Sequence, residues 1–288
     1  MITKTRNIPD GKQKLKNLPI YHYLDVKKLF FPLTSGRCPE GESYVKQGQK
    51  VYVGEKIGLR KASFFEQPIH STVSGTVVGI ERHTDASGKA VECVVVENDQ
   101  AYTLHSTVKE RSDEDIDKLS RAELVEIAKE QALVGLGGSG FPTYIKLNSK
   151  DPIHVVIANG VECEPFLVSD YQLMMEKPEE IVQGMIYAMK ATGAPKGVIT
   201  IKKKYKHLEE HLNEAIKRFP GHDIIVKPIG NYYPQGWELE VIKNAVGIHI
   251  PQGQLLSKYG VANLNVATLA SYYQAVKKRL PVLERYFT

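Results

Sequence analysis

The chain has 288 residues, of which 42% are hydrophobic and 25% charged, and its formal net charge is +5. This length and balance predict a soluble globular protein of two domains and exclude wholesale disorder. No apolar run approaches the roughly 20 residues that a membrane-spanning helix needs, so we expect no direct membrane span. The polar N-terminal stretch lacks the apolar core of a secretory signal, which predicts a cytoplasmic protein.

The cysteines and the basic residues exclude two further classes of site. Cys38, Cys93 and Cys163 are too far apart for a disulfide framework, a zinc site or an iron–sulfur motif. We therefore expect no metal site and no iron–sulfur cluster within this chain. The densest basic run, residues 202–206, begins a predicted helix, which favours a solvated helix face over a nucleic-acid interface. We expect no nucleic-acid partner.

The first part of the chain is predicted to be a β module. Residues 1–29 are a polar segment without predicted chemistry, and residues 30–110 contain short β-branched runs separated by glycine turns. This pattern is similar to the barrel-sandwich fold of biotinyl and lipoyl carriers. A carrier needs a lysine at its hairpin tip, and residues 72–75 contain none. The sequence therefore favours a structural module over the alternative, a biotin- or lipoate-dependent carrier.

Residues 111–288 are predicted to form an α/β domain. Ser120 and Glu123 form a capping-box pair that opens a helix. Pro178 suits the first turn of a later helix that Gly193 would end. Strands are expected at residues 153–158, 197–201 and 223–226, with helices between them and further helices near 238–245 and 266–278. This alternation predicts a parallel sheet covered by helices.

A glycine-rich loop at residues 135–140 is the first candidate binding element. Its glycines would let backbone N–H groups converge on an anion, and Pro142 would begin a helix directed at the same point. Lys146, about one helical turn later, could add a positive charge. The loop is neither a Walker A sequence nor a dinucleotide fingerprint, because no Lys-Ser or Lys-Thr follows it and it comes after a helix. Taken alone, it could equally be a flexible connector.

A second candidate element follows the first predicted parallel strand. Asn159, Glu162 and Glu164 come where open α/β sheets bind ligands, beyond the carboxyl end of a strand. Carboxylates there can accept hydrogen bonds from ribose or ribityl hydroxyls. Cys163 lies within this element, and a small packed thiol is favoured over a redox role.

Four ordered motifs together resemble the RnfC family of electron-transport subunits. They are residues 135–143 with Lys146, residues 159–165, residues 233–236 and residues 265–268. That family is similar in turn to the flavin subunit of respiratory complex I. The resemblance implies a Rossmann-like FMN/NADH-binding domain behind an N-terminal barrel-sandwich hybrid module. It also implies electron transfer from NADH through FMN to an iron–sulfur acceptor, as an NADH dehydrogenase-type component.

Site residues are implied by the same resemblance. FMN would contact Gly137, Gly138, Gly140, Lys146, Asn159, Glu162, Gly236, Asn265 and Thr268. NADH would lie near Phe141, Glu164 and Glu238. Hydride transfer between stacked rings is promoted by positioning, so no side chain is nominated as catalytic.

Three departures from the family pattern leave an alternative open. Val161 stands where the complex I flavin subunit has aspartate, and Trp237 follows Gly236 where glycine or glutamate is expected. Both support a scaffold or docking subunit of a membrane or amino-acid reductase complex, with no working NADH site. Trp237 also carries a narrower resemblance, to RnfC-like proteins associated with D-proline reductase. The third departure is that the family's cysteine quartets have no counterpart here. The iron–sulfur acceptor is therefore expected in a partner domain or subunit, which allows a peripheral place on the cytoplasmic face of a membrane complex.

Overall fold

The computed structural model describes residues 8–85 and 87–288. Two antiparallel sheets make up its N-terminal third. The first has the strand order β1-β7-β6-β3 and the second has the order β2-β4-β5. Their inward side chains, including Val51, Ile57, Val77 and Val94, form one shared core. The strands are β1 (Lys28–Pro32), β2 (Glu40–Ser43), β3 (Lys50–Val51), β4 (Lys56–Lys61), β5 (Glu66–His70), β6 (Gly75–Thr84) and β7 (Ala90–Asn98). The predicted all-β module is confirmed.

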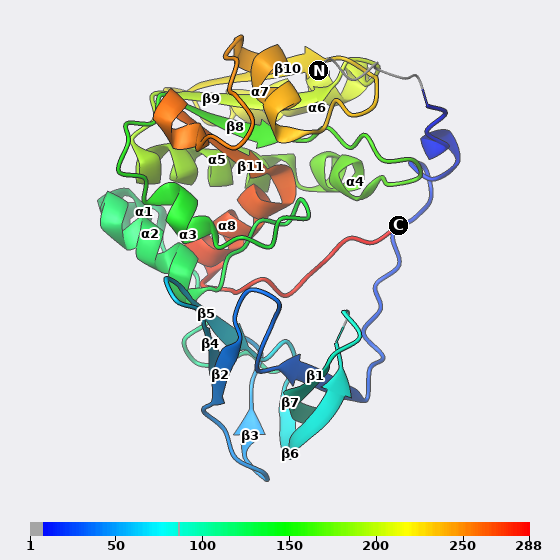
Figure 1. Cartoon of the computed structure of the whole chain (residues 1–288), viewed down its shortest axis with the longest axis vertical. Helices are drawn as coiled ribbons and strands as arrows, with labels where there is room; N and C mark the ends of the chain where they lie inside the picture. Colours follow the sequence, from blue (N-terminus) through cyan, green and yellow to red (C-terminus); the bar gives the residue numbers. More distant parts are fainter. Residues whose placement is uncertain (1–7, 86) are drawn as a thin grey trace.

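The rest of the chain is built around a four-stranded parallel sheet (Figure 1). Its strands are β8 (Val155–Asn159), β9 (Lys196–Lys202), β10 (Asp223–Ile229) and β11 (Val261–Asn265). The helices are α1 (Asp113–Lys118), α2 (Arg121–Glu130), α3 (Thr143–Leu147), α4 (Ser169–Glu176), α5 (Pro178–Thr192), α6 (Lys206–Lys217), α7 (Glu238–Val246) and α8 (Val266–Lys278). Two 3-10 turns, η1 (Lys12–Lys14) and η2 (Leu256–Tyr259), complete the described elements.

Both faces of the parallel sheet are covered, as its continuous apolar strands require. Along β8, Val156 and Ala158 pack into the larger core with α5 and α8, whereas Val155 and Ile157 pack into a smaller core with α7. Alternation with period two thus divides one strand between two helical layers. The predicted α/β class is confirmed.

Local sequence signals set several helix ends. The capping box of Ser120 and Glu123 is formed, Pro178 occupies the first turn of α5, and Gly193 ends that helix with φ +76°. Pro142 differs from its prediction: it is the N-cap of α3 and not its first helical residue, and α3 is only five residues long. A helix this short adds little to anion binding at its N-terminus.

The strand order β10-β9-β8-β11 positions the candidate site. From β8 the chain adds β9 and then β10 on one side, and then returns to place β11 on the other side of β8. The carboxyl ends of β8 and β11 are therefore neighbours at a point where the direction of strand addition reverses. Open α/β sheets bind ligands at such switch points.

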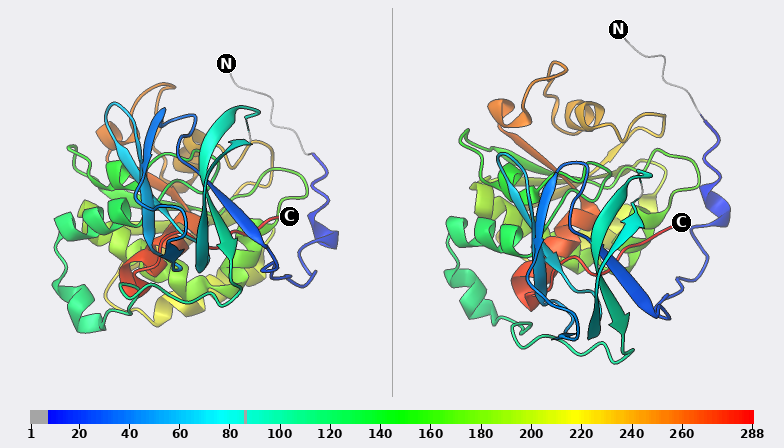
Figure 2. Two further views of the ribbon diagram at one scale, coloured as in Figure 1. Left: turned by 90° about the horizontal axis from the view of Figure 1, so that it is seen from below. Right: turned by 60° about the horizontal axis from the view of Figure 1, so that its bottom comes forward.

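The N-terminal segment runs beside the α/β domain before it enters β1 (Figures 1 and 2). The Phe166 N–H donates to the Asp10 carbonyl at 2.7 Å, and Gln172 Nε2 donates to the Lys16 carbonyl at 2.9 Å. Residues 1–7 of the predicted N-terminal segment lie outside the described residues. Among the helices that the structure describes, none is long and apolar enough to cross a membrane.

Candidate functional site

A cavity of about 590 Å³ opens at the carboxyl ends of β8 and β11. Its volume falls within the range of small-molecule and cofactor sites. The structure brings ten of the twelve predicted site residues to its wall: Gly137, Gly138, Lys146, Asn159, Glu162, Glu164, Gly236, Glu238, Asn265 and Thr268. Gly140 and Phe141 are not part of that lining. Residues from four separate predicted motifs thus meet at one cavity.

The glycine-rich loop is closed at its base by its own backbone, and Arg37 donates to the Ser139 carbonyl at its tip at 2.9 Å. The Gly135 N–H donates to the Phe141 carbonyl at 2.8 Å, and the Gly140 N–H donates to the Gly135 carbonyl at 3.0 Å. Gly138 (φ +98°) and Gly140 (φ +55°) adopt left-handed conformations that favour glycine. Within the described part of the chain, the N–H groups of residues 137–139 have no acceptor. Successive free N–H groups of this kind bind phosphate.

The start of α8 holds the glycine-rich loop in place. The Leu136 N–H donates to Thr268 Oγ1 at 2.9 Å, and Thr268 is fully buried. Asn265 caps α8 by accepting from the Ala267 N–H at 2.9 Å. A Cβ on Gly137 would lie only 3.0 Å from the Asn265 Cβ. Thr268 and Asn265 therefore position the loop against the N-terminus of α8, whose dipole favours an anion.

Lys146 belongs to a hydrogen-bonded group that it forms with residues of β11 and α7 on the cavity wall. Its Nζ donates to the Asn263 carbonyl at 3.1 Å and lies 3.5 Å from Glu238 Oε1. Asn263 Nδ2 donates to the same Glu238 oxygen at 3.1 Å. Among the described residues the buried Asn263 Oδ1 has no partner, so it is available to a ligand donor. Sequence analysis missed Asn263, although its spacing of two from Asn265 places both on one face of β11.

Asn159 and Gly236 join the second and third motifs. Asn159 Nδ2 donates to the Gly236 carbonyl at 3.0 Å, while its Oδ1 accepts from the Val161 N–H at 3.0 Å. A Cβ on Gly236 would lie 2.3 Å from the Val161 carbonyl oxygen, so only glycine fits this close approach. Asn159 thus shapes the cavity with both ends of its amide. Trp237, next to Gly236, lines the cavity and is 47% exposed.

Glu162 caps a helix as well as lining the cavity. Its carboxylate accepts from the N–H groups of Asp170 and Tyr171 at 2.7 and 3.2 Å and from Ser169 Oγ at 3.1 Å, all at the start of α4. The fully buried Lys12 donates to the Glu162 carbonyl at 2.8 Å, and its Nζ lies 3.9 Å from Glu162 Oε2. Burial raises the pKa of Glu162.

Asp170 and Lys12 were absent from the residues expected at this site. Burial, and secondarily the neighbouring Glu162 carboxylate, raise the pKa of Asp170 to about 7. Asp170 also accepts from Asn265 Nδ2 at 2.6 Å. Asp170 comes eight residues after Glu162 and beside a helix start, and this position could have indicated from the sequence that it belongs to the site. Lys12 offered none, because its contact with Glu162 spans 150 residues.

Phe141 and Cys163 lie in different surroundings from the ligand-binding groups. The Phe141 ring faces the β module, with its centroid 6.4 Å from that of Phe65 and 5.9 Å from the Arg37 guanidinium. The base hydrogen bonds of the glycine-rich loop turn it to that side. The expected stacking of Phe141 on NADH stays a prediction that this arrangement does not support. Cys163 is buried, and burial raises the pKa of its thiol, in keeping with a packed role.

Comparison with known families identifies the family of this chain. Residues 128–274 match the Nuo51 FMN-binding domain, and residues 4–101 match the RnfC barrel sandwich hybrid domain. The chain belongs to the Nuo51 FMN-binding domain family. In this member of the family, the FMN-binding domain follows an RnfC-type module, and both the expected fold and the resemblance to RnfC are confirmed.

Relatives of this Nuo51-family chain are components of ion-translocating complexes. It is 35% identical over 285 residues to a component of the Na(+)-translocating ferredoxin:NAD(+) oxidoreductase complex of Acetobacterium woodii, covering 97% of this chain and 62% of the relative. It is 31% identical over 284 residues to a component of the ion-translocating oxidoreductase complex of Edwardsiella ictaluri, covering 97% of this chain and 34% of the relative. The chain therefore spans between about a third and two thirds of the length of these relatives.

A solved structure shares the fold of this family member. The NAD+-reducing [NiFe]-hydrogenase in its H2-reduced state aligns with a TM-score of 0.50 and 22% identity, over 61% of this chain and 36% of the other.

Proposed function

We propose that the chain binds FMN noncovalently in the cavity between β8 and β11 and works as an electron-transfer component. The main supporting observation is that residues 137–139 line that cavity and that, among the described residues, their N–H groups have no acceptor. They suit the phosphate of FMN, and Lys146 adds a positive charge nearby. The buried, unpartnered Asn263 Oδ1 offers an acceptor for a ligand hydroxyl or ring N–H.

The same residues divide the work of binding. Residues 137–139 would hold the phosphate, with Thr268 and Asn265 keeping the loop in place. Asn159 and Gly236 would shape the space for the ring system, and Glu162 would fix the adjoining wall through its cap on α4. When bound, FMN supplies the chemistry of accepting electrons in a pair and releasing them singly. The protein's own contribution is to bind, orient and exclude water.

NADH is the proposed donor, and an iron–sulfur centre in a partner domain or subunit is the proposed acceptor. Relatives whose names include ferredoxin:NAD(+) oxidoreductase support a nicotinamide and an iron–sulfur protein as the two redox partners, and that name describes the same transfer in the reverse direction. Glu164 and Glu238 line the cavity and could accept hydrogen bonds from ribose hydroxyls. We place the chain peripherally on a membrane complex, and its similarity to components of ion-translocating complexes supports this placement.

The test measures FMN binding by the purified chain, with quenching of flavin fluorescence and visible absorbance as the two readouts. Saturable binding is expected, and NADH should then bleach the flavin absorbance under anaerobic conditions. Gly138→Ala should weaken binding at least tenfold, because φ +98° strains any side chain in the glycine-rich loop. Gly221→Ala is the matched control, since Gly221 has φ +91° and open surroundings in a distant turn. Failure of the wild-type chain to retain FMN would refute the proposal.

The alternative function is a scaffold or docking subunit without a working NADH site. Trp237 favours it, because this large ring stands at the cavity wall beside Gly236. Flavin that binds but is not bleached by NADH, and is bleached after Trp237→Gly, would support this alternative.

A further inference from the structure

Asp170 lines both the candidate flavin cavity and a second cavity. The proposed binding of FMN assigns no role to its carboxyl group. We propose that Asp170 is a proton-holding residue that controls the binding of a phosphorylated ligand: protonated Asp170 admits the phosphate at residues 137–139, and ionised Asp170 repels it. The inference rests on the proposed function, since it takes the FMN phosphate as the anion bound there.

One side chain connects Asp170 to the predicted phosphate position. Asn265 Nδ2 donates to Asp170 Oδ2 at 2.6 Å, and the Asn265 Cβ lies 3.0 Å from where a Cβ on Gly137 would be. Gly137 carries one of the three unpartnered N–H groups. A negative charge on Asp170 would therefore lie close to a bound phosphate, in a part of the domain where water screens poorly.

Lys12, a cation whose charge favours ionised Asp170, is held by Glu162 and makes no ion pair with Asp170. Lys12 donates to the Glu162 carbonyl at 2.8 Å and lies 3.9 Å from the Glu162 carboxylate. Glu162 itself accepts from the Asp170 N–H at 2.7 Å, so the two acidic residues are neighbours. Glu164 adds a further negative charge on the same side. One lysine thus serves an acidic pair, and a proton on Asp170 would neutralise its second member.

Most of the other charged groups around Asp170 are paired with one another, whereas Arg285 has no carboxylate partner among the described residues. In the lining of the flavin cavity, Lys146 lies 3.5 Å from Glu238. On the side of α5 and the C-terminal tail, Lys177 and Glu284 pair at 2.9 Å and Lys278 lies 3.6 Å from Glu180. The remaining charged groups nearby are Arg285 in the tail and the Asp10, Lys202 and Lys204 group beside Lys12.

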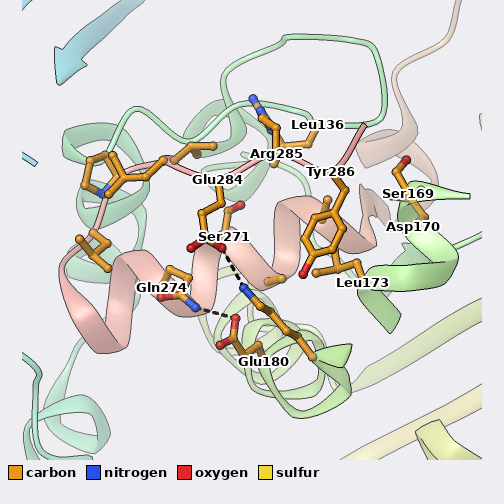
Figure 3. A pocket seen from close by; sticks show the side chains of 17 residues that line it. Leu136, Ser169, Asp170, Leu173, Glu180, Ser271, Gln274, Glu284, Arg285 and Tyr286 are labelled. Atoms are coloured by element: carbon orange, nitrogen blue, oxygen red, sulfur yellow. Dashed lines mark hydrogen bonds and ion pairs between the residues drawn. The ribbon is translucent and has the colours of Figure 1, made fainter. Parts of the chain in front are cut away.

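A second cavity gives Asp170 a route to solvent protons. It has a volume of about 140 Å³ and is lined by α4, α5, α8 and tail residues 280–286. Figure 3 shows Ser169 and Asp170 at one end of it, away from Gln274. Leu136, Ser169 and Asp170 line both cavities. The space is large enough for several waters, so Asp170 can exchange its proton while a ligand fills the flavin cavity. The raised pKa of Asp170, about 7, agrees with this assignment.

The first test measures the Kd of FMN, and of riboflavin as the phosphate-free probe, at pH 7.0 and 8.5. For the wild-type chain the Kd of FMN should rise about tenfold, as expected for one proton linked to binding, and that of riboflavin less than twofold. In Asp170→Asn, which keeps an acceptor for Asn265, the Kd of FMN should change less than threefold. An equal rise in Asp170→Asn overturns the proposal. Lys202→Gln is the control, because burial lowers the pKa of Lys202 to about 8 and it could cause the same trend.

The second test needs no variant and follows the proton directly. Calorimetric titration of FMN into the wild-type chain at pH 8, in two buffers of different ionisation enthalpy, should show uptake of about 0.9 proton per FMN bound. Binding without proton uptake overturns the role of Asp170 and leaves the proposed function standing. If neither FMN nor riboflavin binds at pH 7, the proposed function fails and the role of Asp170 fails with it.

Discussion

Thr268→Val tests whether α8 holds the glycine-rich loop in its binding conformation. Thr268 is fully buried, and its Oγ1 accepts the Leu136 N–H at 2.9 Å. Valine keeps the shape of threonine but removes this acceptor, and a buried donor without a partner costs about 1 to 3 kcal/mol. Since 1.4 kcal/mol is tenfold in affinity, the Kd of FMN should rise between about fivefold and a hundredfold. The free energy of unfolding should fall by less than this, because the loop of the free variant can move until water accepts from the Leu136 N–H, and the full cost then arises only when FMN binds.

Fluorescence titration with FMN and urea unfolding measure the two effects of Thr268→Val separately. Thr268→Ser keeps the acceptor and should bind FMN within about threefold of wild type. Thr192→Val removes a buried hydroxyl that donates to the Ala188 carbonyl at 2.8 Å in α5, outside the cavity lining. It should destabilise the fold without changing FMN affinity. The reasoning is refuted if Thr268→Val binds FMN like wild type, or if Thr192→Val weakens binding to the same extent.

Three further predictions concern the cavity walls. Lys146→Ala should weaken FMN binding by about 1.5 to 3 kcal/mol, the worth of a charged hydrogen bond, and an unchanged Kd would exclude Lys146 from the phosphate site. Gly236→Ala should weaken FMN binding at least tenfold and lower the Tm, because its Cβ would meet the Val161 carbonyl oxygen at 2.3 Å; Gly36→Ala, in open space, should do neither. Because the pKa of Asp170 is raised to about 7 from its usual 3.8, its ionisation costs stability as pH rises through that window. Urea unfolding of Asp170→Asn should therefore show a gain over wild type that is larger at pH 8 than at pH 5; an equal gain at both would contradict the burial argument.

Much of the α/β fold was predictable because its signals are local. The capping box of Ser120 and Glu123 and the stop at Gly193 each depend on residues within a few positions of one another. The period-two pattern of β8 likewise predicts which of its side chains face each helical layer. The fold class follows from such signals in chain order, since alternating strands and helices have few compact arrangements.

The candidate site was predictable in its members more than in their roles. The motifs led to ten residues of one cavity wall. However, the Glu162 carboxylate accepts hydrogen bonds from the start of α4, and the Asn159 amide makes its hydrogen bonds to two loops. The direction of Phe141 depends on how the glycine-rich loop closes. These assignments require knowing where each polar atom finds its partner, and those partners are mostly distant in sequence.

The path of the N-terminal segment links parts of the molecule that a sequence-based division separates. Lys12 precedes the whole β module, yet it supplies the cation beside Glu162 in the α/β domain. A shortened protein that began after residue 110 would retain every glycine and asparagine of the cavity wall and still leave this carboxylate without its lysine. The two modules therefore cannot be exchanged independently between family members, and a chimaera should carry its N-terminal segment from the same parent as its flavin domain.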